Sequence, residues 1–224
     1  NARGERYPDP AAAAARVVAA GADLVTCHPR LDQRHIRFED LPALRRASPV
    51  LNLEMAAVDA MLDHALRLQP DWACIVPETR EEITTEGGLD VDVAALPRII
   101  ERLKRSDIKV SLFVDPDERS VRRSAELGAD AVELHTGAYA QADRSRMQSE
   151  LQRLIDATDV GLAAGIAVHA GHGLTLDNLS LVAAIPGIQE LNIGHALICD
   201  ALFVGGLEAS VAAYKARIAS ARES

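Results

Sequence analysis

The chain has 224 residues, 48% of them hydrophobic and 25% charged, which suits one globular domain with a buried core. Its net charge of −9 argues against nucleic acid or an anionic membrane as the main partner, but it allows a local cationic pocket. No apolar run approaches the roughly 20 residues of a membrane span. The three cysteines, Cys27, Cys74 and Cys199, lack metal or redox spacing, which predicts reduced thiols in a reducing compartment such as the cytoplasm.

Short apolar segments alternate with amphipathic ones along the chain, which predicts parallel strands covered on both faces by helices. We expect strands at 23–28, 50–56, 72–77, 109–115, 131–136, 166–170 and 191–196. We expect helices at 10–20, 40–47, 58–69, 97–106, 118–127, 144–163, 176–184 and 199–222. The glycines in 20–23 (AGAD) and 127–130 (LGAD) repeat one helix-to-strand connection, so we predict a single α/β domain over 1–224.

Polar side chains end nearly every predicted strand, which favours a (β/α)₈ TIM barrel over a doubly wound sheet. A doubly wound sheet concentrates such residues at one switch point, and here no Gly-x-Gly-x-x-Gly turn follows an early strand. Because the chain opens on a loop-like segment, NARGERYPDP, we expect the eighth strand upstream of Asn1, in which case this sequence is a fragment, a processed product or a partial record. Alone, it is then expected to leave two sheet edges unpaired and to be poorly stable and inactive.

The segment 25–36 (VTCHPRLDQRHI) gathers cationic groups where the first predicted strand ends. Arginine presents a fork that matches phosphate oxygens, and histidine can donate a hydrogen bond or move a proton. His28, Arg30 and His35 are therefore candidates for an anion-binding and proton-transfer loop. A solvated loop with incidental charges is an equally good interpretation of the composition.

The segment 51–56 (LNLEMA) places a carboxyl group inside an apolar strand. Strand alternation puts Asn52 and Glu54 on the lumen side, opposite Leu51, Leu53 and Met55. A partly buried carboxyl group has a raised pKa, which suits a general base near neutral pH. We favour this role for Glu54 over an ion pair with a neighbouring arginine.

The later strand ends carry glutamate, histidine and glycine. The string VELHTG contains Glu133, HAGHGL places His172 between two glycines, and LNIGHAL contains Gly194 and His195. The last two strand ends of barrels often bind phosphate through exposed glycine amides, so we favour anion binding over packing. The loop 78–90, which contains Thr84, could bind an anion, form a mobile lid or be a plain turn. Because no His-x-His or His-Glu-x-x-His pair occurs, we predict no metal.

Taken in order, the strings NARG, YPDP, LNLEMA, TTEGGLD, ELHTG, AGHGL and ELNIGHA resemble the pyridoxine 5′-phosphate synthase family over essentially the whole chain. The resemblance implies a (β/α)₈ barrel with extra helices that assembles as a homo-octamer. It implies condensation of 1-deoxy-D-xylulose 5-phosphate with 3-amino-2-oxopropyl phosphate to give pyridoxine 5′-phosphate, phosphate and water. It implies no metal and no organic cofactor. Two phosphorylated substrates would explain a cationic loop in an acidic protein.

The resemblance also implies residue roles. His28 and Glu54 correspond to proton acceptors, His172 to the proton donor and Glu133 to the transition-state carboxyl group. The residues that correspond to contacts with the deoxyxylulose phosphate are Arg30, His35 and Thr84. The residues that correspond to contacts with the aminoketone phosphate are Arg3, Gly173, Gly194 and His195.

One departure from the family pattern motivates an alternative. The family opens with a strand of roughly Asn-x-Asp-His-Ile-Ala before NARG, which contacts both ligands and is not in this sequence. The alternative is therefore an inactive fragment or a non-catalytic subunit. A phosphosugar aldolase is less favoured, because it needs a lysine at the end of a strand, and Lys104, Lys109 and Lys215 are not placed there.

Overall fold

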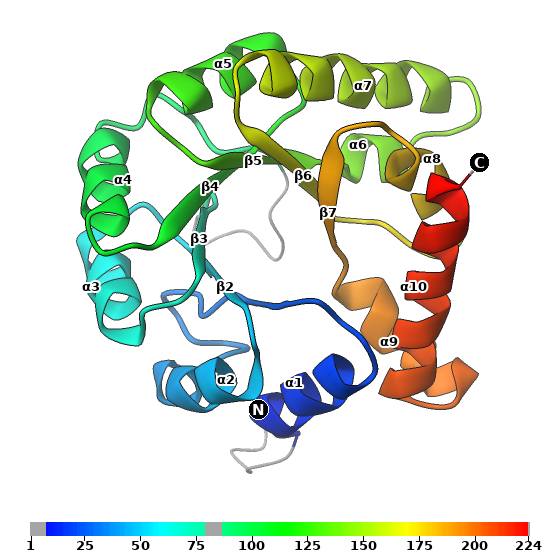
Figure 1. Ribbon diagram of the computed structural model, residues 1–224, viewed down its shortest axis with the longest axis horizontal. Coiled ribbons are helices and arrows are strands. Elements are labelled where there is room, and N and C mark those ends of the chain that lie inside the picture. Colours follow the sequence, from blue (N-terminus) through cyan, green and yellow to red (C-terminus); the bar gives the residue numbers. More distant parts are fainter. Residues whose placement is uncertain (1–7, 79–86, 224) are drawn as a thin grey trace.

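The strands form one parallel sheet whose spatial order follows the sequence. The computed structural model describes residues 8–78 and 87–223 (Figure 1). In this part of the chain a seven-stranded sheet runs β1-β2-β3-β4-β5-β6-β7. The strands are β1 (Val25–Cys27), β2 (Leu51–Met55), β3 (Trp72–Ile75), β4 (Lys109–Val114), β5 (Ala131–His135), β6 (Ala167–Gly171) and β7 (Ile188–Asn192). The sheet curls around a lumen with the helices outside it, which confirms the predicted α/β, TIM-barrel-like class.

The helices lie on the outer side of the curled sheet, and most follow a strand (Figure 1). They are α1 (Pro10–Ala19), η1 (Phe38–Asp40), α2 (Leu41–Ala47), α3 (Asp59–Leu68), α4 (Leu96–Lys104), α5 (Glu118–Glu126), α6 (Gly137–Ala140), α7 (Met147–Ala163), α8 (Leu179–Ala183), α9 (His195–Val204) and α10 (Leu207–Arg222). Local chemistry sets the start of α1. Asp9 caps α1 by accepting hydrogen bonds from the amides of Ala11 and Ala12, and Pro10 occupies the first turn.

The apolar core lies between the sheet and the helices, which leaves the lumen face for polar groups. On β2, the side chains of Leu51, Leu53 and Met55 are fully buried in this core. Asn52 and Glu54 alternate with them and face the lumen, where Asn52 donates a hydrogen bond to Thr26 of β1 and Glu54 lines a cavity. The predicted two-faced pattern of this strand is therefore confirmed, and it carries Glu54 to the lumen.

The last strand and the helices after it differ from the prediction. β7 spans Ile188–Asn192, whereas we expected 191–196, so His195 begins α9 and does not end a strand. The predicted helix at 199–222 is two helices, because Gly205 and Gly206 adopt positive φ angles of 102° and 105° and end α9. The short helix α6 was not predicted.

No single helix among the described residues is long and apolar enough to cross a membrane. The helices α9 and α10 pass that test only as a pair, and a bend of 116° separates them.

The two outermost strands of the sheet, β1 and β7, approach each other through side chains. No backbone pairing joins them in the described ranges. Thr26 Oγ1 of β1 donates a hydrogen bond of 2.8 Å to Asn192 Oδ1 of β7. Lys215 of α10 forms a 2.6 Å ion pair with Asp23, just before β1. In the described residues, β1 and β7 are thus joined by side-chain contacts, and α10 contacts the segment before β1.

Candidate active site

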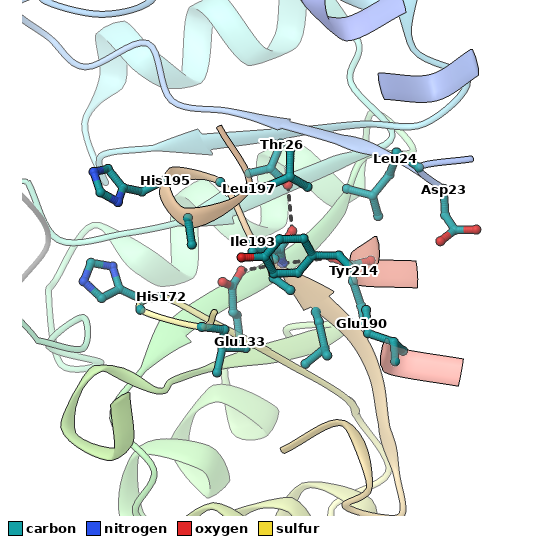
Figure 2. Close-up of a pocket in the computed structure, with 18 of the residues that line it drawn as sticks. Asp23, Leu24, Thr26, Glu133, His172, Glu190, Ile193, His195, Leu197 and Tyr214 are labelled. Carbon is teal, nitrogen blue, oxygen red and sulfur yellow. Dashed lines mark hydrogen bonds between the residues drawn. The ribbon is translucent and has the colours of Figure 1, made fainter. Parts of the chain in front are cut away.

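A cavity of about 820 Å³ opens at the carboxyl ends of the strands and continues between β1 and β7 (Figure 2). All four residues predicted to be catalytic line it: His28, Glu54, Glu133 and His172. Glu54 and Glu133 lie within β2 and β5, and His28 and His172 directly follow β1 and β6. The curl of the sheet thus brings together positions that are far apart in sequence. In Figure 2, His172 and His195 lie on one side of Glu133, and Glu190 lies on the other.

His28 lies between two carboxyl groups. Its Nδ1 atom is 3.4 Å from Glu54 Oε2, and its Nε2 atom is 3.4 Å from Glu78 Oε2. Among the described residues, neither His28 Nε2 nor Glu78 Oε2 has a hydrogen-bond partner, so this contact is a close approach of two polar groups. The other oxygen of Glu78 accepts a 2.7 Å hydrogen bond from the amide of Leu31, which ties the loop after β1 to the end of β3. Among the described residues, the charged partner of Glu54 is therefore an imidazole.

Burial disfavours the charged form of both members of this pair. Removal from water raises the pKa of Glu54 from 4.5 to about 7. Burial likewise lowers the pKa of His28 below 6.5, and the opposing attraction of Glu78 is smaller. Near neutral pH, His28 is therefore mainly neutral and Glu54 is partly ionised. Both groups can then accept a proton, as a general base must.

Glu133 of β5 lines the cavity, with 2% of its surface exposed. Its Oε2 atom accepts hydrogen bonds from Asn192 Nδ2 at 3.0 Å and from Cys74 Sγ at 3.7 Å. Burial, followed by the negative charges of Glu54 and Glu190, raises the pKa of Glu133 well above 4.5. Burial thus favours the protonated form of this group, which can donate a hydrogen bond.

The close approach of Glu133 to β6 depends on a glycine. A Cβ atom at Gly171 would lie 2.2 Å from Glu133 Oε1 and 3.1 Å from the carbonyl oxygen of Asn192. The absence of a side chain at Gly171 therefore makes room for the carboxyl group.

Sequence reasoning missed Asn192, which connects the two sides of the cavity. Its Nδ2 atom donates to Glu133 and also to Glu190 Oε1 at 3.0 Å, and its Oδ1 atom accepts from Thr26. Asn192 is a polar residue within the apolar string LNIGHAL, and this pattern could have identified it. The same pattern in LNLEMA led to the prediction for Glu54.

His172 follows β6 and packs against two other rings. Its ring centroid is 5.0 Å from that of His135 and 6.5 Å from that of Phe113. Nδ1 of His135 is in turn 3.3 Å from Asp115 Oδ1, at the end of β4. Burial and the neighbouring His135 lower the pKa of His172 below 6.5. The free site therefore holds His172 mainly in its neutral form at pH 7.

The predicted phosphate contacts divide into three groups. Gly173, Gly194 and His195 line the cavity, and Gly194 is the N-cap of α9. Arg30 and His35 follow β1 but are not among the side chains that line the cavity, and Arg30 is 4% exposed. The remaining two, Arg3 and Thr84, lie outside the described residues.

Within 8–78 and 87–223, no group of three or more His, Cys, Asp and Glu residues is arranged to hold a metal ion.

Acid–base groups at the carboxyl ends of parallel strands, gathered around one lumen, define a TIM-barrel-like enzyme. The family model for "Pyridoxal phosphate biosynthesis protein PdxJ" matches residues 1–220. The chain is 51% identical over 207 residues to pyridoxine 5′-phosphate synthase from Gluconobacter oxydans (strain 621H), covering 92% of this chain and 88% of that protein. The chain therefore belongs to the PdxJ family, whose members are biosynthetic enzymes of the transferase type.

Solved structures with low sequence identity share the fold. A native KDPGal structure has a TM-score of 0.68 and 18% identity, covering 97% of this chain and 92% of that one. Phosphoribosyl anthranilate isomerase from Thermus thermophilus has a TM-score of 0.63 and 18% identity, covering 94% of each chain. At such low identity, these similarities show the fold alone.

Proposed function

We propose that this chain condenses 1-deoxy-D-xylulose 5-phosphate with 3-amino-2-oxopropyl phosphate to give pyridoxine 5′-phosphate, phosphate and water. Membership of the PdxJ family supports the reaction. The observation that carries the proposal is the convergence of His28, Glu54, Glu133 and His172 on one cavity of about 820 Å³. Ring formation by condensation and dehydration needs several proton transfers, and these four groups offer both acceptors and donors.

The residue environments support different roles for the four groups. Glu54, with a pKa of about 7, and the mainly neutral His28 are suited to accept protons from the substrates. Burial raises the pKa of Glu133 and so favours its protonated form, which is suited to stabilise developing negative charge by donating a hydrogen bond. His172 is suited to deliver a proton, because the negative charge of a bound phosphate would raise its pKa again.

The phosphate groups are assigned to two ends of the site. The exposed Gly194 precedes α9 and Gly173 follows β6, so their amides are suited to hold the phosphate of the aminoketone together with His195. We assign Arg30 and His35 to the phosphate of the deoxyxylulose substrate, as the family resemblance implies. Arg3 and Thr84 are assigned to the two phosphates in the same way.

The assembly and the compartment follow from the resemblance as further parts of the proposal. We propose a homo-oligomer, an octamer by family resemblance, that works without a metal or organic cofactor. The free thiols Cys27, Cys74 and Cys199 are consistent with a reducing compartment such as the cytoplasm.

The test is a direct assay with both phosphorylated substrates. Pyridoxine 5′-phosphate is quantified by mass spectrometry, and released phosphate is measured in parallel. His172→Asn should lose product formation, whereas Glu101→Gln, which alters an exposed ion pair on α4, should keep it. A chain that is folded by circular dichroism but forms no product would contradict the proposal and favour the non-catalytic alternative.

A further inference from the structure

His172 has a backbone conformation that residues other than glycine rarely adopt. Its φ angle is +80°, and the next residue, Gly173, has a φ angle of +77°. Glycine adopts this left-handed region freely, but a histidine is strained there because its Cβ atom crowds the backbone. Such strain persists only where the surrounding structure holds the backbone in place. The direction of the His172 imidazole is therefore set by whatever fixes this turn.

Thr136 holds the turn from the end of the neighbouring strand. It follows β5, and none of its surface is exposed. Its amide donates a hydrogen bond of 2.9 Å to the carbonyl oxygen of Gly171. Its hydroxyl group lies 2.7 Å from the same oxygen and 2.5 Å from the carbonyl oxygen of His172. One side chain thus contacts the two peptide groups that flank the Cα atom of His172, and these peptide groups define its φ and ψ angles.

A second set of contacts holds the other side of the turn. Asn178 Nδ2 donates 3.1 Å to the carbonyl oxygen of Gly173, and Asn178 Oδ1 accepts 2.8 Å from the amide of Thr175. The hydroxyl group of Tyr139 on α6 donates 2.7 Å to the carbonyl oxygen of Asn178. A Cβ atom at Gly173 would lie 2.8 Å from Ala140 Cβ, so α6 packs directly against the turn.

We propose that Thr136 is a positioning residue for His172, acting through the backbone and without touching a substrate. The inference rests on the proposed function, because it assigns Thr136 to the placement of the proposed proton donor. The hydroxyl group ties together the two peptides on either side of His172, and the imidazole thereby keeps its place beside His135 and Phe113 at the cavity wall.

A second buried threonine, Thr158, has a hydroxyl group whose hydrogen bond is confined to its own helix, and it serves as a comparison for Thr136. Thr158 on α7 is fully buried, and its Oγ1 atom donates 2.7 Å to the carbonyl oxygen of Leu154, one turn earlier in its own helix. That bond joins residues of one helix and lies outside the cavity lining. Thr136, in contrast, joins β5 to the turn after β6 and reaches both peptides of a candidate catalytic residue. Thr158 therefore provides a matched control.

The experiment compares three variants of the full chain. Thr136→Val keeps the shape but removes the hydroxyl group, Thr136→Ser keeps the hydroxyl group, and Thr158→Val removes the control hydroxyl group. We expect Thr136→Val to lower kcat by about 10²-fold with little change in KM, since small displacements of a catalytic group have effects of this size. Thr136→Ser should restore most of kcat, and Thr158→Val should keep kcat even if its melting temperature falls.

The second readout is the pKa of the His172 imidazole, followed by nitrogen-15 NMR in the free protein. Burial keeps this pKa below 6.5, so an imidazole that swings away from its neighbours in Thr136→Val should titrate closer to 6.5. Thr158→Val should leave it unchanged. A loss of global stability alone would not move the titration of His172 in the folded protein.

Several outcomes would overturn the inference. One is a Thr136→Val enzyme with the kcat and His172 titration of Thr158→Val, and another is a Thr136→Ser enzyme as slow as Thr136→Val. If Thr136→Val does not fold, Thr136→Ala removes the same hydroxyl group with a smaller side chain, and an unchanged kcat and His172 titration in that variant would overturn the inference instead. A wild-type chain that makes no product contradicts the proposed function, and the NMR titration then decides the role of Thr136 by itself.

Discussion

Replacing Glu54 by glutamine should weaken catalysis and, at alkaline pH, stabilise the fold. Glutamine keeps the shape of the side chain but can neither accept the proton nor carry the charge. Loss of a general base commonly costs about 10²-fold to 10⁴-fold in rate, so we expect kcat to fall by at least about 10²-fold.

The stability change follows from the pKa of Glu54. Its value is about 7 in the folded chain, against 4.5 for an exposed glutamate. The folded state therefore keeps the proton to higher pH than the unfolded state, and ionisation opposes folding increasingly from pH 4.5 up to about pH 7. A difference of about 2.5, at about 1.36 kcal/mol per pKa unit, amounts to about 3 kcal/mol above pH 7 and less than about 1 kcal/mol at pH 5. Glu54→Gln should remove this cost.

The assay is urea unfolding of the wild type and of Glu54→Gln at pH 5 and pH 8, together with steady-state kinetics. The exposed pair of Glu101 and Arg105 supplies the control, and Glu101→Gln should change the free energy of unfolding by less than about 1 kcal/mol at both pH values. If Glu54→Gln shows the wild-type change in stability between pH 5 and pH 8, the raised pKa is wrong. If it also turns over at the wild-type rate, Glu54 has no place in the mechanism.

Two other predictions concern the anion sites and the glycine beside Glu133. Crystals soaked in phosphate or sulfate should show one anion at the amides of Gly173 and Gly194 and another near Arg30 and His35, and anions found only elsewhere would refute both assignments. Gly171→Ala should lower kcat by about 10-fold or more, because its Cβ atom would meet Glu133 Oε1 at 2.2 Å, and a variant with normal kinetics would show that the position of Glu133 is not critical.

The central strands could be predicted from the sequence because their apolar runs are bounded by clear turns. The prediction for β2, 50–56, differs from Leu51–Met55 by one residue at each end, and its alternation placed Glu54 in the lumen. At β7 the prediction was wrong because apolar residues continue from the strand through Ile193 into α9, so hydrophobicity alone gives no boundary. The helix prediction at 199–222 overlooked the pair of glycines at 205 and 206.

The sequence could predict which side chains face the lumen where strand alternation alone determines the side-chain direction, as for Glu54 and Glu133. The candidate site was not predictable where contacts join distant parts of the chain. Asn192 reaches Glu133 across 59 positions, and Thr136 reaches His172 across 36. The loop after β1 shows the same limit, because composition suggested that Arg30 and His35 are cationic ligands but could not tell whether their side chains reach the cavity.

Two carboxyl groups of the cavity retain protons to higher pH than exposed glutamates do. Glu54 and Glu133 both have raised pKa values, so near neutral pH the cavity carries less negative charge than its composition suggests. A phosphorylated ligand that enters brings further negative charge, which makes ionisation of these groups harder still. Binding should therefore draw protons from the solvent, and affinity for phosphorylated ligands should weaken as the pH rises through about 7. Calorimetric titrations in buffers of different ionisation enthalpy would count these protons directly, and equal heats in all buffers would show that none is taken up.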